Sequence, residues 1–419
     1  MPVRRCSLTR RSLPWLAEAF AKAAAEAVAE VGRDLRLAHP GGCPWSQQIN
    51  DASRQMNYWR AVVQAAKADD LETIRELMTE YPELVQNDRA LVTSARYGHE
   101  DIVMFLLGET PELESVRKAL VAAVFPYRSV PKTERHGVLV RTLLWKVPEE
   151  RQKAAIARQL IDAAARSGCR PIADALIEVA TQDVYTSAAF GDLDTVQEWT
   201  KQSRSIVRHG DESGKTALHY CAASALGLED DQVAQGLVNV AQHLLEWGAE
   251  VSARCRPERE SPFGLTPLDC AVLYGDNPDL VSVLVNHGAQ ELESALWELL
   301  VHRRDPGEIQ YRSAGVLLDA GASLDRPFNG RTILQDLAHH GSEESVRWAI
   351  AHGADIYAQT SDLRTALHLS ADRDDGEAIV DALLAAGADP AVTDEAGHAP
   401  LWYADKGERQ AIVDRLRTS

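Results

Sequence analysis

The chain has 419 residues, of which 45% are hydrophobic and 25% charged, and this ordinary composition supplies enough apolar surface for a folded protein. Its formal net charge of -18 makes nucleic acid and anionic membrane surfaces poor partners, because most of the surface repels phosphate groups. No apolar run reaches about eighteen residues, so we expect no transmembrane helix.

The six cysteines are scattered, and no Cys-x-x-Cys pair or short framework spacing occurs among them. Scattered cysteines are typical of free thiols in a reducing compartment. We therefore expect a cytoplasmic location.

The first predicted element is an amphipathic helix in an N-terminal extension, residues 1–57. Apolar side chains recur there every three or four positions, as on one helix face. We expect this helix to cap the domain that follows; a partner-binding or membrane-surface helix is the alternative. A turn-rich connection, Pro40–Trp45, follows it. The apolar positions are Leu16, Phe20, Ala24, Ala27, Val31 and Leu35.

Residues 58–210 read as divergent pairs of helices. Alanine-rich stretches such as Ala65–Leu71 and Ala95–Val103 each run into a second apolar stretch, and similar pairs begin at Ala163 and Ser187. The pair near Leu120 to Leu144 is less regular, because Pro126 and Pro131 interrupt the helical pattern and indicate a lengthened loop.

Residues 211–419 contain a repeated ending in which glycine follows an apolar helical stretch and alanine follows glycine. Successive glycines are 40, 33, 32 and 34 residues apart, a spacing typical of stacked structural repeats. Glycine is favoured there because the residue after a helix end adopts a left-handed conformation. The endings lie at Gly248, Gly288, Gly321, Gly353 and Gly387.

A second recurring phrase opens each of these units. Threonine can cap the helix N-terminus, proline or alanine suits the first turn, and leucine enters the core. The phrase therefore predicts where each unit's first helix begins. It occurs at Thr216–His219, Thr266–Asp269, Thr332–Gln335 and Thr365–His368, with a weaker copy at Ala399–Trp402.

With these openings and endings, and with glycines between them at 214, 264, 330 and 397, the sequence resembles the ankyrin-repeat family over residues 211–419. The resemblance implies an all-α fold: an ankyrin-repeat solenoid of about eleven helix-turn-helix units with hairpin loops, preceded by the N-terminal helical extension. It also implies that His219 and His368 link neighbouring units by hydrogen bonds. Three segments are expected: the extension at 1–57, divergent repeats at 58–210 and well-matched repeats at 211–419.

Motifs for other chemistry are weak. Gly210–Thr216 resembles a phosphate-binding loop but has three residues between its glycines where the motif needs four, so we interpret it as a hairpin tip. The rings of His339 and His340 should diverge on a helix, which disfavours a shared metal. We predict no catalytic residue, no cofactor and no metal ligand.

The resemblance implies that the inner helix of each unit lines a concave binding face. Aligning the units places one set of side chains on that face, and four aromatic rings among them belong to types enriched at binding hot spots. The predicted partner-binding residues are Lys67, Arg96, Tyr97, Arg166, Phe190, Tyr220, Leu273, Tyr274, His339, His340, Asp372 and Arg373. The hairpin tips add Phe263, Phe328, Asn329, Arg331, Asp362, Arg364 and Glu395.

The predicted function is a scaffold or inhibitor, monomeric by itself, that binds another protein on the concave face and hairpin tips, without nucleic acid or membrane. One alternative is an unconventional enzyme or small-molecule binder with a pocket between the N-terminal extension and residues 118–150. Another is an exported or host-directed effector, which rests on analogy of fold and on the unusual N-terminus. The alanine- and arginine-rich usage favours a bacterial source.

Overall fold

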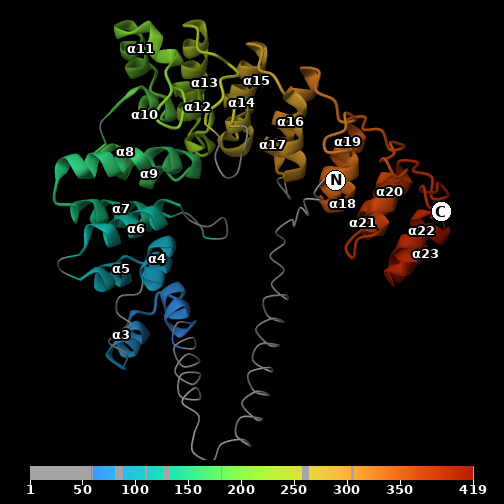
Figure 1. The fold of residues 1–419 in the computed structure, drawn as a ribbon, viewed down its shortest axis with the longest axis horizontal. Helices are drawn as coiled ribbons and strands as arrows, with labels where there is room; N and C mark the ends of the chain where they lie inside the picture. Colours follow the sequence, from blue (N-terminus) through green and yellow to red (C-terminus); the bar gives the residue numbers. More distant parts are fainter. Residues whose placement is uncertain are drawn as a thin grey trace, which may run out of the picture. The chain divides into compact units, whose positions relative to one another are not determined.

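The computed structural model describes residues 58, 60–80, 88–108, 111–125, 130, 133–180, 182–256, 264–302 and 306–418. The chain divides into two compact units, Met1–Thr93 and Ser94–Ser419. The secondary structure of the described residues consists of helices and two isolated β-bridges (Figure 1). This confirms the predicted all-α class. The predicted extension and its connection, residues 1–57, lie outside the described residues.

In the first unit, the described residues form a helix over 60–67 and the helix α3 (Leu71–Glu80). Asp70 caps α3, since its carboxylate accepts hydrogen bonds from the amide and the hydroxyl of Thr73 at 3.0 and 2.6 Å. Ala66 and Ile74 are fully buried, so the two helices bury apolar side chains as a pair.

The other described helices form ten further pairs, which with the first pair makes the eleven that the sequence predicts. We call the first helix of each pair inner and the second outer. The inner helices are α4 (Asp88–Tyr97), α6 (Leu113–Val124), α8 (Glu150–Ser167), α10 (Val184–Ala189), α12 (Ala217–Ala222), α14 (Pro267–Cys270), α16 (Leu292–Trp297), α18 (Ile333–His340), α20 (Ala366–Ala371) and α22 (Pro400–Lys406). The outer helices are α5 (Glu100–Leu107), α7 (Glu134–Trp145), α9 (Arg170–Ile177), α11 (Leu193–Gln202), α13 (Asp231–Glu246), α15 (Pro278–Asn286), α17 (Glu308–Asp319), α19 (Glu343–Ala351), α21 (Glu377–Ala385) and α23 (Gln410–Thr418).

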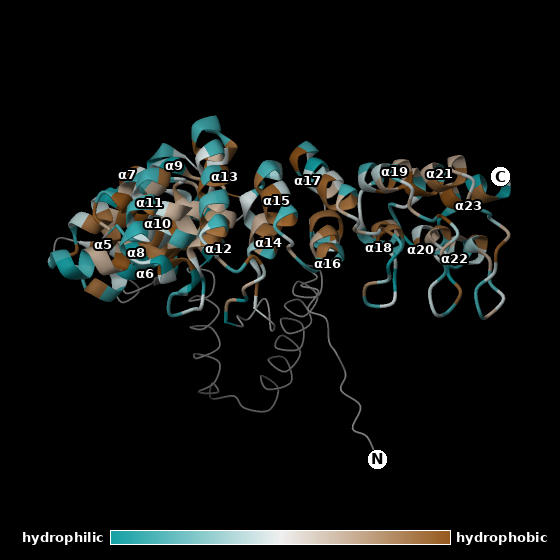
Figure 2. Ribbon diagram, turned by 90° about the horizontal axis from the view of Figure 1, so that it is seen from above, coloured by the Kyte–Doolittle hydropathy of each residue, from teal (hydrophilic) through white to brown (hydrophobic). Residues whose placement is uncertain are grey.

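Within the second unit, inner helices pack on inner helices and outer on outer. Figure 2 shows this for the last repeats, where α18, α20 and α22 form one row, α19, α21 and α23 form another, and the hairpins project beyond the inner row. Each helix pair thereby buries its apolar side on its neighbours, as stacked repeats must. One continuous hydrophobic core runs from Val184 to Leu416.

The repeated opening phrase begins the inner helices as predicted. The Thr266 hydroxyl accepts a hydrogen bond from the amide of Asp269 at 3.1 Å, while the Asp269 carboxylate accepts one from the Thr266 amide at 2.8 Å. Thr332 and Gln335 form the same reciprocal box. Each box provides partners for amides that the first helical turn leaves unbonded.

Histidine completes the box in two repeats and also links neighbours. The Thr216 amide donates to Nδ1 of His219 at 3.1 Å, so Nε2 carries the proton and donates to the Leu265 carbonyl of the next hairpin at 3.1 Å. His368 forms the same link, with its Nε2 3.2 Å from the carbonyl oxygen of His398. Both predicted links are confirmed.

The predicted helix endings are also confirmed. All five glycines of the glycine-alanine endings have φ between 85 and 99 degrees, in the left-handed region where a Cβ atom is unfavourable. At Gly248 the amide donates to the Leu245 carbonyl at 2.9 Å, and the next amide donates to the Leu244 carbonyl at 2.9 Å. The chain then leaves the outer helix toward the next hairpin.

Two inner helices end in π-helical turns. The helix α14 continues into the turn Ala271–Gly275, and α16 continues into Glu298–His302. A Cβ atom on Gly275 would lie 2.2 Å from the Ala222 carbonyl oxygen, so glycine permits the first turn to approach the end of α12. Such turns re-aim side chains away from regular helical positions.

A 3₁₀ turn, Leu226–Leu228, lies ahead of α13. Asp230 caps α13 by accepting hydrogen bonds from the amides of Gln232 and Val233. The irregular unit predicted near Leu120 to Leu144 is the pair α6 and α7. Part of its loop, and part of the hairpin that contains Phe263, lie outside the described residues.

Candidate functional site

The predicted partner-binding residues differ in exposure. Lys67, which lies in the first unit, is exposed, as are His340 and Asp372, whereas Tyr220 is buried with only 4% of its surface exposed. The expected exposure of Tyr220 is therefore wrong. The half-buried members of the set are Arg96, Tyr97, Arg166, Phe190, Leu273, Tyr274, His339 and Arg373.

Tyr220 is buried because it bonds to the preceding hairpin. Its hydroxyl donates to the Asp211 carboxylate at 2.6 Å, and its ring lies 5.4 Å from that of Tyr185 on α10. The Arg158 guanidinium lies over both rings, 5.4 and 5.5 Å from their centroids, and pairs with Asp183. Burial and the bond to Asp211 raise the pKa of the Tyr220 hydroxyl.

A second group joins α8 to the hairpin before α12 and to the turn after α14. The Arg166 guanidinium lies 4.9 Å from the centroid of the Tyr274 ring and 2.8 Å from the Asp162 carboxylate. That carboxylate also lies 3.1 Å from Nζ of Lys215, a side chain that is itself nearly buried. The structure therefore brings together two predicted residues, Arg166 and Tyr274, and places them among charged neighbours that the sequence did not single out.

Toward the end of the chain, the predicted residues Asp372 and Arg373 act within the fold. Nη1 of Arg373 donates to the Gly341 carbonyl at 2.8 Å, and Nε donates to Asp375 at 2.8 Å. Asp372 lies 3.5 Å from the Arg409 guanidinium. Arg373 thereby ties the end of α20 to the end of α18, and Asp372 keeps an exposed carboxylate.

The expectation for His339 and His340 is wrong in its geometry. Their rings lie edge to face with centroids 3.8 Å apart, and Nδ1 of His339 lies within hydrogen-bond distance of Nε2 of His340. Nη1 of Arg331 lies 3.2 Å from the same Nδ1, which places a cation beside the pair. Across the described ranges, no three His, Cys, Asp or Glu side chains gather closely enough to hold a metal ion.

The predicted hairpin tip at Gly210–Thr216 is confirmed, and its geometry recurs near the C-terminus. Oδ1 of Asp211 accepts hydrogen bonds from the amides of Ser213 and Lys215, both at 2.9 Å. Gly214 supplies the left-handed turn with φ of 78 degrees. These loop amides are therefore already bonded to the carboxylate of Asp211.

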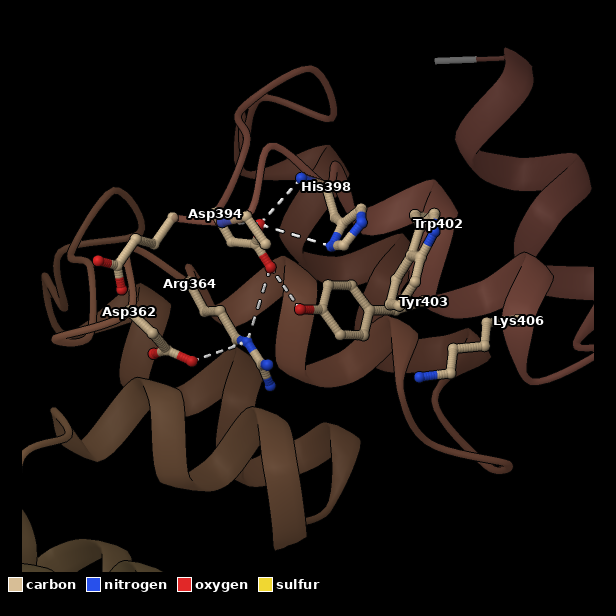
Figure 3. A pocket seen from close by; sticks show the side chains of 9 residues that line it. Asp362, Arg364, Asp394, His398, Trp402, Tyr403 and Lys406 are labelled. Atoms are coloured by element: carbon tan, nitrogen blue, oxygen red, sulfur yellow. Dashed lines mark hydrogen bonds and ion pairs between the residues drawn. The ribbon is translucent and has the colours of Figure 1, made fainter.

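A hollow of about 430 Å³ lies between the last two hairpins and α22. Figure 3 shows Arg364 just below Asp394, Asp362 to their left, and Tyr403 to their right with its hydroxyl directed at Asp394. The sequence predicted three lining residues as hairpin tips, namely Asp362, Arg364 and Glu395. It missed the others, of which Trp402, Tyr403 and Lys406 come from α22 and Asp394, Ala396 and His398 from the hairpin.

Asp394 organises this hollow. Its Oδ1 accepts hydrogen bonds from the amides of Ala396 and His398, both at 2.9 Å, and its Oδ2 accepts the hydroxyl of Tyr403. The hydrogen bond from Tyr403 and those from the amides lower the pKa of Asp394 to about 2. Burial and the same hydrogen bond raise the pKa of Tyr403 to about 12. The carboxylate is therefore ionised at neutral pH.

The same aspartate-tyrosine bond, with tyrosine nine residues after aspartate, occurs at Asp211 and Tyr220. This repeated spacing was the sequence signal that could have identified the missed pair. In both places a guanidinium group lies over the tyrosine ring. At Tyr403 it is the guanidinium of Arg364, 4.7 Å from the ring centroid. Nε of Arg364 lies 2.9 Å from the Asp362 carboxylate.

Aromatic and apolar side chains at the hollow remain open to solvent. Trp402 is 38% exposed, with the His398 ring stacked on it at 3.8 Å between centroids and Nζ of Lys406 at 4.7 Å. Leu363, at the neighbouring hairpin tip, is 44% exposed. Phe328, one hairpin earlier, is 36% exposed, and its ring centroid lies 5.2 Å from that of Trp297. Exposed large apolar groups near one another are typical of binding surfaces.

Within the described part of the chain, no helix combines the length and the apolar character that crossing a membrane requires.

Comparison with known families identifies the repeats. A model described as "Ankyrin repeats (3 copies)" matches residues 310–394, and a model described as "Ankyrin repeat" matches residues 263–293. A search of curated proteins finds no match.

Solved structures with similar folds include the ankyrin repeat domain of Bcl-3, a member of the IkappaB protein family, and that of human ASB11. The Bcl-3 domain is 22% identical, with a TM-score of 0.45, and the match covers 57% of this chain and 98% of that domain. The ASB11 domain is 20% identical, with a TM-score of 0.41 and coverage of 56% and 98%. From the two family models, the chain contains ankyrin repeats.

Proposed function

We propose that this chain is a protein-binding scaffold or inhibitor, and that its inner face and hairpin tips hold the partner. Ankyrin repeats generally mediate protein–protein interaction, and the finer assignment rests on where this chain leaves side chains available. The observation that carries it is the exposure of Leu363 and Trp402 beside the hollow at the last two hairpins.

Neighbouring charges support recognition at this surface. Arg364 and Lys406 line the hollow together with Glu395, an exposed hairpin residue. An aromatic anchor surrounded by such polar groups resembles the centre and rim of a protein interface. The half-buried side chains of Arg166 and Tyr274 extend the proposed surface to the inner face of α8 and of the turn after α14.

Tyr220 is not part of the proposed surface, because its hydroxyl and ring are used within the fold. The remaining predicted residues of the set stay in the proposal as partner contacts. We also propose a cytoplasmic location, which the free thiols of Cys221, Cys255 and Cys270 support.

The test is affinity purification from a lysate of the native organism with wild type and with Leu363→Ser/Trp402→Ala. The matched control is Leu228→Ser/Trp145→Ala, which changes the same residue types at positions that are 44% and 81% exposed and lie away from the hollow. Circular dichroism checks that all three proteins are folded.

We expect a protein that co-purifies with wild type and with the control but not with the Leu363→Ser/Trp402→Ala variant. Equal retention by all three proteins would show that the hairpin surface does not hold the partner. Retention of no protein by wild type would overturn the scaffold proposal.

A further inference from the structure

Although the net charge of the chain is -18, one segment of the sequence is basic. Residues 113–170 contain twelve lysines and arginines against five aspartates and glutamates, whereas residues 355–418 contain six against thirteen. The basic segment spans α6, α7 and α8. A reversal of sign on this scale creates a local field that can attract an anionic ligand to one part of the molecule.

The inner helix α6 presents part of this charge together with apolar groups. Leu113, Arg117 and Val121 are spaced by four residues, so they lie along one helix face, and all three are exposed. Leu113 and Val121 are among the large apolar side chains that the fold leaves exposed. This face is therefore both basic and partly apolar.

The neighbouring inner helix α8 continues the surface. Arg151, Ala155 and Gln159 are exposed and are also spaced by four residues. Nη2 of Arg117 donates to Oε1 of Gln159 at 3.0 Å, which shows that the exposed faces of α6 and α8 adjoin. We call the exposed residues Leu113, Arg117, Val121, Arg151, Ala155 and Gln159 the α6–α8 face.

The cations of this face differ from those nearby in having no carboxylate partner. Among the described residues Arg151 has no ion pair, and Arg117 bonds to the neutral amide of Gln159. By contrast, Arg158 and Arg166 on the same helix α8 pair with Asp183 and Asp162. Two guanidinium groups thus remain available to an external anion, and each can bind a carboxylate through two hydrogen bonds.

We propose that the α6–α8 face binds an acidic segment of the partner protein in which apolar side chains alternate with aspartate or glutamate. The inference rests on the proposed protein-binding function and specifies the partner's chemistry. Carboxylates of the segment pair with Arg117 and Arg151, and its apolar side chains cover Leu113 and Val121, which removes apolar surface from water.

A protein segment fits this face better than a nucleic acid or an anionic membrane does. A nucleic-acid duplex or a bilayer is larger than the basic segment, so its phosphates would also approach the acidic rest of the chain and be repelled. That acidic part accounts for the net charge of -18. Nucleic acid presents no aliphatic side chain beside its phosphates that could cover Leu113 and Val121. A short acidic segment satisfies both requirements.

The experiment measures fluorescence anisotropy of a labelled synthetic peptide of alternating glutamate and leucine with the full chain. The variants are Arg117→Gln/Arg151→Gln and Val121→Ser, and the matched control is Arg141→Gln/Lys146→Gln, which removes the same charge from the end of the outer helix α7. A glutamine-leucine peptide, duplex DNA and phosphatidylserine vesicles are compared with the acidic peptide.

We expect the acidic peptide to bind wild type and the control alike, with binding that weakens as salt is added. The arginine variant should bind on the order of tenfold more weakly or worse, because it loses two charge-assisted contacts. The Val121→Ser variant should bind severalfold more weakly. The glutamine-leucine peptide should not bind measurably.

Equal peptide binding by wild type and the arginine variant, or equal binding of the two peptides, would overturn the inference. Tighter binding of DNA or vesicles than of the acidic peptide would reassign the face to that ligand and overturn it as well. A partner lost only in the Leu363→Ser/Trp402→Ala variant, with no peptide binding, would leave the proposed function intact and reject the acidic segment alone.

Discussion

Protonation of His219 should destabilise the middle of the array as pH falls. The imidazole accepts a hydrogen bond at Nδ1 from the Thr216 amide and donates from Nε2 to the Leu265 carbonyl. A second proton at Nδ1 would face the N–H group of Thr216, and the Thr216 hydroxyl oxygen, 2.9 Å away, would be its acceptor at the cost of the bond from the amide. Burial lowers the pKa of His219 to about 4 from its ordinary value of 6.5.

Because the pKa of His219 is lowered in the folded state, the free energy of unfolding decreases as pH falls. The folded state disfavours the charged imidazole, so stability is fully present above the unfolded pKa of 6.5 and is lost as pH falls toward 4. The linkage relation gives a loss of about 2 kcal/mol by pH 5 and about 3 kcal/mol by pH 4. A single repeat can open locally, so the loss should appear first around residues 216–220.

The assay compares wild type with His219→Ala across this pH range. Urea denaturation followed by circular dichroism gives the unfolding free energy, and hydrogen exchange reports the amides of α12 directly. At pH 7 the variant should be less stable by about 2 to 5 kcal/mol, because the Thr216 amide and the Leu265 carbonyl lose their partner. That difference should shrink toward pH 4. Parallel pH dependences for the two proteins would refute the reasoning.

Three further predictions concern single groups. Tyr403→Phe should raise the pKa of Asp394 above its value of about 2, so that the carboxylate protonates at higher pH in a carbon-13 carboxyl titration, and an unchanged titration would contradict the assigned bond. Gly264→Ala should destabilise more than Gly353→Ala by thermal denaturation, since both have positive φ but only at Gly264 would the Cβ atom meet a backbone oxygen, at 2.0 Å. The Cys221 thiol should resist alkylation until the protein unfolds, because burial raises its pKa, and rapid labelling of folded protein would argue against that burial.

The sequence predicts features whose cause lies within one or two turns of chain. A threonine followed three residues later by histidine, aspartate or glutamine predicts a helix start, because the bonds of the box join residues of the same turn. A glycine after a helix predicts its end, because the left-handed conformation is a property of that residue alone. The recurrence of these local signals predicts the repeats of residues 211–419.

Whether an individual side chain is buried, paired or exposed depends on residues of other repeats, which local sequence patterns do not reveal. Tyr220 is buried because Asp211 accepts its hydroxyl and Arg158, from two repeats earlier, covers its ring. Arg166 and Arg151 occupy the same side of α8, yet Arg166 has a carboxylate partner whereas Arg151 has none among the residues that the structure describes. The sequence thus determined the repeats and the helix boundaries. Packing between repeats decided which charges and rings remain available to a partner, because those contacts join residues dozens of positions apart.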